Sequence, residues 1–166
     1  EIRLYGERNV IDTGTRVGMH RVLVGRAAAI TEVPAPARDG AIRIDNLLQR
    51  ASDFGMHSVA TTDHGTMFGA IEFYDKATRA GIKPIIGIEI YVAPRTRFDK
   101  TPLDNKGLSH LILLAENQEG YRHLCKLASA AQLEGFYYRP RIDKQILKEN
   151  SDGLIGMTAC LHGEVP

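Results

Sequence analysis

Thr62-Asp63-His64-Gly65 is the stretch that decides how the rest of the chain is interpreted. It follows a short apolar, β-branched run at 58–61 and precedes a helix-like segment at 67–80. In open α/β folds, functional side chains gather at the carboxyl ends of strands, which is where this Asp-His pair is expected. A neutral imidazole can bind a metal ion, and a neighbouring carboxylate can bind or orient it. The tetrapeptide alone also fits a turn that caps a helix.

Three further apolar strand patterns each carry one residue of a metal-ligating type. They are 84–92 with Glu89, 110–115 with His110, and 153–160 with Cys160. A carboxylate inside a buried strand is costly unless it is paired or bound to a cation. Each residue has an ordinary alternative: a Glu at a sheet edge, a His in a loop, and a buried structural Cys. Their repetition on or beside several strands instead predicts one site built from several elements.

Length and composition restrict the class of protein. The chain has 166 residues, enough for one domain, and its net charge of +1 gives no global attraction to nucleic acid or membranes. Two cysteines without a secretory pattern, and no apolar run long enough to span a bilayer, predict a cytoplasmic protein with no membrane partner. Local basic groups at 95–100 and at 139–141, beside Tyr137 and Tyr138, could touch phosphates or form a solvated face.

Apolar residues at helical spacing predict helices between the strands. The predicted helices are 44–51 with Gly55 as its stop, the stripe Ile71, Tyr74, Ala77 and Thr78 with Phe73 alongside and closed by Gly81, 121–128, and a short helix at 142–149 with Asp143 near its start. On the third helix, Cys125 is expected in the core and His123 on the surface. Residues 98–109 are expected to form a loop. Alternating strands and helices predict an α/β fold with a parallel sheet.

Several stretches together resemble one known family. They are Asp39-Gly40-Ala41, Thr62-Asp63-His64-Gly65, 68–74, 81–87, 91–95, 110–115, Glu134-Gly135-Phe136-Tyr137-Tyr138 and 159–166. This text resembles the amino-terminal PHP (polymerase and histidinol phosphatase) domain of bacterial DNA polymerase III alpha subunits. The resemblance covers 39–166, about three quarters of the chain. The last two stretches are particular to the polymerase branch, and free-standing PHP phosphatases are not expected to carry them.

The resemblance implies a distorted (βα)7 barrel, similar to a TIM barrel, with ligands at the carboxyl ends of its strands. The barrel is expected to be incomplete here, because the family's first strand, with its His-Leu-His-x-His pattern, is missing and the closing elements are absent. Residues 39–166 are therefore interpreted as a partial PHP domain. The chain is expected to be an amino-terminal fragment, or a product cut at both ends.

Residues 1–38 differ in composition from the rest. Residues 1–40 contain six Arg and no Lys, whereas 41–166 contain eight Arg and seven Lys. The codons for Val33 to Arg38, shifted by one base, can encode nearly the missing histidine-containing strand. One hypothesis is that this segment is translated out of frame, and the other is that it is a genuine divergent extension. Either way it is expected to lack stable structure, since no amphipathic pattern offsets its backbone entropy.

The resemblance also implies a cluster of up to three divalent metals that assists phosphoester hydrolysis. The family's ligands that remain in this sequence are Asp39, His64, Glu89, His110 and Cys160. The resemblance makes Asp63 a supporting or structural residue and His162 a loop residue. The mixed nitrogen, oxygen and sulfur set favours zinc or manganese over magnesium alone. About five of the family's nine ligands are present, so weak metal binding is expected.

Three functions stay open at this point. The first is the PHP part of a replicative polymerase, a DNA-directed nucleotidyltransferase whose PHP site in some members is a 3′–5′ exonuclease. Its implied partners are DNA, the rest of the polymerase chain and the replication holoenzyme subunits. The second is a stand-alone phosphoesterase acting on a small phosphate monoester. The third is a non-catalytic docking module, and the isolated chain is expected to be inactive or nearly so.

Overall fold

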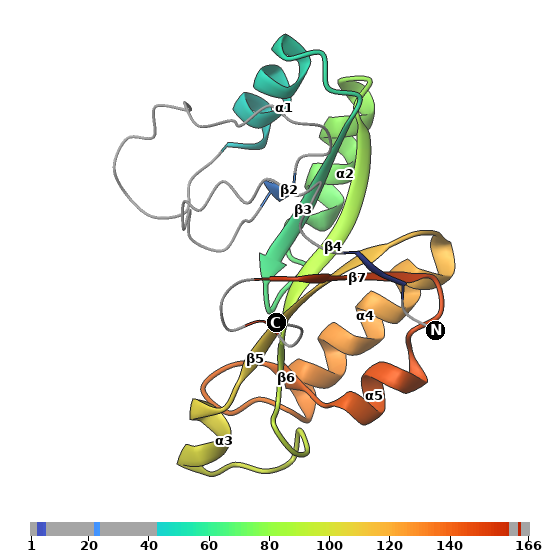
Figure 1. Cartoon of the computed structure of the whole chain (residues 1–166). Helices are drawn as coiled ribbons and strands as arrows, with labels where there is room; N and C mark the ends of the chain where they lie inside the picture. The colour runs from blue at the N-terminus through green and yellow to red at the C-terminus, as the bar shows by residue number, and fades with distance from the viewer. Residues whose placement is uncertain (1–2, 6–21, 24–42, 160–162, 164–166) are drawn as a thin grey trace.

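The computed structural model describes residues 3–5, 22–23, 43–159 and 163 (Figure 1). In chain order the elements are β1 Arg3–Tyr5, β2 Val22–Leu23, α1 Ile44–Asp53, β3 Ser58–His64, α2 Ala70–Arg79, β4 Lys83–Val92, α3 Pro102–Lys106, β5 Ser109–Ala115, α4 Gln118–Leu133, β6 Arg141–Ile142, α5 Lys144–Glu149 and β7 Leu154–Thr158. Asp39, Cys160 and His162 lie outside the described residues. Most of residues 1–38 also lie outside the described residues. The predicted boundary between an extension at 1–38 and a PHP domain at 39–166 therefore stays a prediction.

The fold is α/β, with one mixed sheet. Its strand order is β1-β7-β5-β4-β3-β2, and β6 pairs with β4 off this path. Within the described residues the sheet is open, because the order begins at β1 and ends at β2 without closing. The long strand β4 runs through the molecule, with α2 beside its first half and α4 beside its second (Figure 1).

The predicted parallel sheet is wrong for two of the central pairs. β3 and β4 are parallel, but β5 runs antiparallel to both β4 and β7. A parallel neighbour needs a crossover, usually a helix that packs on the sheet. The segment between β4 and β5 contains only the short helix α3, and the chain doubles back instead. The apolar patterns of 84–92 and 110–115 carry no information about strand direction, so the sequence could not distinguish the two cases.

Two main apolar clusters hold the helices against the sheet. α1 and α2 pack on β3 through a cluster that includes Leu47, Leu48, Val59 and Phe73. α4 packs on the central strands through a cluster formed by Ile88, Ile90, Val92, Leu111, Leu113, Leu124, Leu127, Ala131, Ile142 and Leu154. A third, smaller cluster contains Ala60, Ile112 and Met157, whose positions alternate with those of the α4 cluster along β5. Because side chains alternate along a strand, this third cluster lies on the opposite face of the sheet from α4.

The predicted ends of the first two helices are confirmed by their glycines. Gly55 and Gly81 both adopt positive φ, at 64° and 72°, just beyond α1 and α2. Their amides hydrogen-bond to carbonyls of the preceding turn, as expected for a glycine that ends a helix. The glycine therefore decides where each helix stops.

Three predictions about individual segments are wrong. α2 buries Ala70, Phe73 and Ala77, so Phe73 and Ala77 are buried as predicted, while Ile71 and Tyr74 of the predicted stripe are exposed. The buried face is therefore rotated by about one residue from the predicted one. Cys125 is exposed because the buried stripe of α4 runs through Leu124 and Leu127.

The segment 98–109 is also not entirely a loop, since α3 forms within it. Asp104 accepts hydrogen bonds from the Thr101 amide and hydroxyl at the start of α3. His123, expected on the surface, is half-buried, and its Nδ1 lies 2.8 Å from the Asp152 carbonyl oxygen. No helix among the described residues has the length and apolar character needed to cross a membrane.

Candidate metal centre

Strand register brings three of the predicted ligands onto one face of the sheet. His64 at the end of β3 pairs directly with Glu89 on β4. His110 at the start of β5 pairs with Tyr91, two residues beyond Glu89. Residues opposite one another, or two apart on one strand, share a face, so all four side chains lie on the face opposite α4. Two parallel strands and one antiparallel strand therefore build this site.

The side chains of His64, Glu89 and His110 converge on one carboxylate oxygen. His64 Nε2 and His110 Nδ1 each lie 2.9 Å from Glu89 Oε1. All three ligand atoms lie within 4.8 Å of one another. The imidazole rings are 5.5 Å apart, edge to face, so neither blocks the other's nitrogen. The predicted meeting of these three residues is confirmed, although their binding of a metal stays a proposal.

The burial of Glu89 is what makes this cluster chemically unusual. Its side chain has no exposed surface, while those of His64 and His110 are 26% and 20% exposed. A buried carboxylate is stable only with hydrogen bonds or a nearby positive charge. The two half-buried imidazoles leave the cluster accessible from one side. A buried carboxyl group thus lies beneath two imidazoles that reach solvent.

These three residues fit a divalent metal ion by donor type and by spacing. Two imidazole nitrogens and one carboxylate oxygen suit zinc or manganese better than magnesium or calcium, which prefer oxygen alone. Ligand atoms held about 2.1 Å from one ion lie roughly 3.0–3.4 Å apart. The two contacts to Glu89 Oε1 are close to that separation, and all three ligand atoms lie within 4.8 Å of one another.

The residues around the cluster orient it. Tyr91 lies against both imidazoles, with ring centroids 4.9 Å from His110 and 5.8 Å from His64. The Gly65 amide donates to the Glu89 carbonyl at 2.8 Å, which fixes the turn after His64. Tyr91 was missed as a site residue, although its position two residues after Glu89 in a predicted strand was a usable signal.

The other predicted site residues have different outcomes. Asp63 is buried and accepts a long hydrogen bond from Thr61, and alternation along β3 places it on the face opposite His64. Asp39 and Cys160 lie outside the described residues, so their ligation stays a prediction. Cys160 follows β7 by two residues, and β7 ends with Thr158 paired to Leu111, next to His110.

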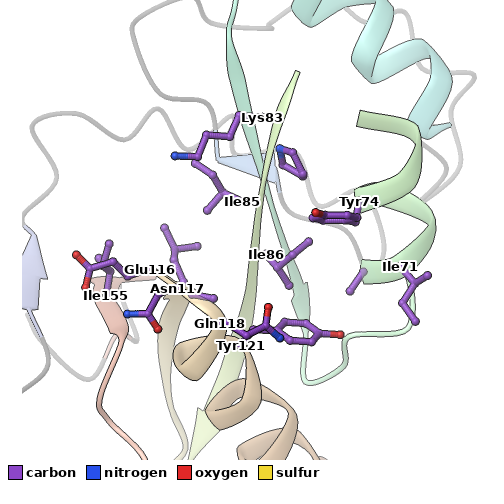
Figure 2. A pocket seen from close by; sticks show the side chains of 14 residues that line it. Ile71, Tyr74, Lys83, Ile85, Ile86, Glu116, Asn117, Gln118, Tyr121 and Ile155 are labelled. Carbon is purple, nitrogen blue, oxygen red and sulfur yellow. The ribbon is translucent and has the colours of Figure 1, made fainter. Parts of the chain in front are cut away.

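A cavity of about 540 Å³ lies elsewhere on the molecule. Figure 2 shows Ile71 and Tyr74 of α2 facing it, with Ile85 and Ile86 from the first half of β4 and Gln118 and Tyr121 from the start of α4. Its lining includes none of the three converging ligands. The volume of a cavity therefore does not identify the reactive site in this molecule. The proposed chemistry rests on the cluster of His64, Glu89 and His110.

The fold and the cluster together define an α/β domain with a candidate metal-ligating group near the ends of its strands. The family model described as "PHP domain" matches residues 36–166. This chain therefore belongs to the PHP domain family, and its PHP region is similar to the amino-terminal region of DNA polymerase III alpha subunits.

Two curated relatives give the level of similarity. DNA polymerase III subunit alpha of Borreliella burgdorferi is 53% identical over 129 residues, which is 77% of this chain and 11% of that protein. The same subunit of Helicobacter pylori is 52% identical over 127 residues, which is 76% of this chain and 10% of that protein. The chain thus spans about a tenth of the length of these relatives.

Among solved structures, similarity was found to a proposed metal-dependent phosphoesterase from Bifidobacterium adolescentis. The TM-score is 0.36 and the sequence identity 20%, over 55% of this chain and 30% of that one. Similarity this low carries no argument about the site.

Proposed function

We propose that this chain acts as the PHP region of a polymerase like the DNA polymerase III alpha subunit, with a divalent-metal site for phosphoester hydrolysis. The observation that carries the proposal is the meeting of His64 Nε2 and His110 Nδ1 at Glu89 Oε1. The roughly 50% identity to alpha subunits supports the polymerase context. Replication, DNA as a partner, the holoenzyme subunits and a cytoplasmic location follow from that context as parts of the proposal.

The five proposed ligands are Asp39, His64, Glu89, His110 and Cys160. A bound divalent metal would polarise a phosphoester oxygen and help to activate water. Glu89 would supply the negative charge that offsets the cation, in an interior position that water does not reach. His64 and His110 would hold their nitrogens toward the exposed side, and Tyr91 would restrict their rotation.

The site is proposed to be incomplete in this chain, as the family pattern implies. Two histidines of the family's first strand have no counterpart among the residues before Asp39. In the same way, we propose that further strands complete the (βα)7 barrel in the polymerase, whereas the described sheet is open. Metal binding and hydrolysis by this chain should therefore be weak.

Two alternatives from other classes compete with this proposal. A stand-alone phosphoesterase is less well supported, because Glu134 to Tyr138 and 159–166 follow the polymerase pattern. A docking role is compatible with the metal site, and one observation favours it. Ile71 and Tyr74 are 70% and 53% exposed beside the cavity, so an apolar surface lies away from the proposed metal.

The test of the proposed function uses the full chain, manganese or zinc, and single-stranded DNA with a labelled end. Calorimetry should show metal binding that is lost in His64→Ala and kept in the control His57→Ala, an exposed histidine of the same type. Degradation of the DNA should be slow or absent. Metal binding that is unchanged in His64→Ala would refute the proposed site. Rapid metal-dependent degradation of the DNA that His64→Ala abolishes would refute the proposal that the site is incomplete.

A further inference from the structure

The basic groups at 95–100 and 139–141 were candidates for phosphate binding, and two of their arginines are held in ion pairs. The Arg95 guanidinium makes two parallel hydrogen bonds of 3.0 Å to the Asp104 carboxylate. Arg97 hydrogen-bonds to Glu134 at 2.5 Å and to Asp143 at 3.0 Å. Guanidiniums committed in this way to carboxylates hold the fold together and are poorly available to an incoming anion.

The Arg141 guanidinium is also not available, because it is bound to backbone carbonyl oxygens in the protein interior. It is fully buried, and it donates to the carbonyl oxygens of Gly135 and Arg97 at 2.8 and 3.2 Å. Its guanidinium also lies 5.3 Å from the centroid of the Tyr137 ring. Because no surface of Arg141 reaches solvent, its function is to fix the segment 134–141.

Arg139 is different from these three arginines. It is exposed, and no carboxylate in the described part of the chain forms an ion pair with it. Its Nη1 donates to the Tyr91 hydroxyl at 2.7 Å, and its guanidinium lies 5.0 Å from the centroid of that ring. Tyr91 in turn contacts both His64 and His110. The Arg139 guanidinium thus contacts Tyr91, which in turn contacts both histidines of the proposed metal site.

The segment around Arg139 is fixed against the end of β3. A Cβ added to Gly65 would lie 2.6 Å from Pro140 Cγ, so Pro140 packs directly on the turn after His64. Gln132, at the end of α4, donates to the Gly65 carbonyl at 3.3 Å. The position of Arg139 relative to His64 is therefore set by packing on both sides.

Aromatic side chains lie beside Arg139 in sequence and on the surface. Tyr138 is 75% exposed and Phe136 is 50% exposed. Tyr138 adopts a positive φ of 59°, which is rare for a bulky residue, and its ring is edge to face with Tyr137 at 4.7 Å. Such strain at an exposed position suggests a functional placement, and exposed aromatic rings beside a cation are the elements that bind single-stranded nucleic acid.

We propose that Arg139, held in place by its hydrogen bond to the buried Tyr91, binds a backbone phosphate of single-stranded nucleic acid, and that Tyr138 stacks on an adjacent base. This inference rests on the proposed function, since it places the strand end at the His64–Glu89–His110 cluster. One donor of Arg139 is used by Tyr91, and the remaining guanidinium donors are available to phosphate oxygens. A small phosphate ester would need Arg139 alone, whereas an exposed aromatic ring favours a nucleotide chain.

The experiment measures fluorescence anisotropy of a labelled oligothymidylate of about 15 nucleotides with the full chain, without metal and at several salt concentrations. Arg139→Gln should weaken binding about tenfold and reduce the slope of log affinity against log salt by about 0.7, the loss of one phosphate contact. Tyr138→Ala should weaken binding roughly 5- to 150-fold with little change of slope. The matched control Arg122→Gln, an exposed arginine on α4, should behave as the wild type.

Two further measurements separate the outcomes. Manganese binding by calorimetry should be unchanged in Arg139→Gln and Tyr138→Ala. Loss of the metal site can therefore be distinguished from loss of the oligonucleotide site. Inorganic phosphate should displace the oligonucleotide only at far higher concentration. The inference is overturned by a wild-type chain that does not bind the oligonucleotide, by Arg139 and Tyr138 variants that bind it normally, or by phosphate competing at equal concentration.

Discussion

Replacing Glu89 with glutamine separates a metal ligand from a purely structural carboxylate. The side chain keeps its size but loses its charge, in a position with no exposed surface. In the metal-free chain, its two contacts to His64 and His110 lose charge assistance, which costs about 1–1.5 kcal/mol each. Relief of the cost of burying a carboxylate, several kcal/mol, opposes this loss. The metal-free variant should therefore be as stable as the wild type within about 2 kcal/mol.

Metal binding should respond much more strongly to the same change. Loss of a group that only supports a ligand commonly costs 10- to 100-fold in affinity, so loss of the Glu89 carboxylate should cost at least about 100-fold. At a metal concentration 100 times the wild-type Kd, binding adds about 2.7 kcal/mol to the free energy of unfolding. With a Kd raised 100-fold, the same concentration adds only about 0.4 kcal/mol.

The assay is chemical denaturation of the wild type, Glu89→Gln and the control Glu72→Gln, with and without manganese or zinc. Glu72 is an exposed glutamate on α2, so its variant should keep the full metal effect. The reasoning is refuted if Glu89→Gln retains the wild-type metal stabilisation. It is also refuted if metal adds nothing to any variant while Glu89→Gln loses several kcal/mol, since Glu89 would then be structural only.

Three other changes test separate parts of the fold. Burial acts to raise the pKa of Asp143, but hydrogen bonds from the Ile146 and Arg97 amides and the Arg97 guanidinium lower it below its ordinary 3.8. A lowered folded-state pKa gives stability that is present above pH 3.8 and lost as pH falls through the folded value. Asp143→Asn should therefore be less stable than the wild type at pH 7 and approach it toward pH 2 in urea titrations. Gly65→Ala should lower the free energy of unfolding by about 1–3 kcal/mol more than Gly55→Ala does. Both glycines have positive φ, but only Gly65 packs against Pro140, so equal losses in the two variants would contradict this packing. Cys125 is exposed, so a thiol reagent should modify this residue in the native chain, as read by mass spectrometry of the peptide that contains it, and an unmodified Cys125 would contradict its exposure.

The sequence was most informative where one residue type decides a backbone conformation or where apolar spacing is regular. Gly55 and Gly81 were predicted to end their helices and do so with positive φ. Glu89 within an apolar run was predicted to need a partner, and the partners are two histidines distant in sequence. The ligands could be found because each interrupts or borders an apolar strand.

The parts that the sequence left undetermined depend on contacts between elements. The direction of β5 follows from how the chain returns past α3, which no local pattern encodes. The buried faces of α2 and α4 are each selected by the partner surface, so Ile71 and Cys125 were assigned to the core although both are exposed. Arg139 and Arg141 look alike in sequence, yet one is exposed and the other fully buried.

The most direct test of the central claim is the X-ray absorption spectrum of the zinc-loaded full chain. The account predicts scattering from two imidazoles with Zn–N distances of about 2.0–2.1 Å. This signal should disappear in the double variant His64→Ala and His110→Ala, and remain in the control His57→Ala and His123→Ala. A spectrum that lacks imidazole scattering, or one that the control changes and the His64 and His110 variant does not, would contradict the assignment of His64, Glu89 and His110 as a metal site.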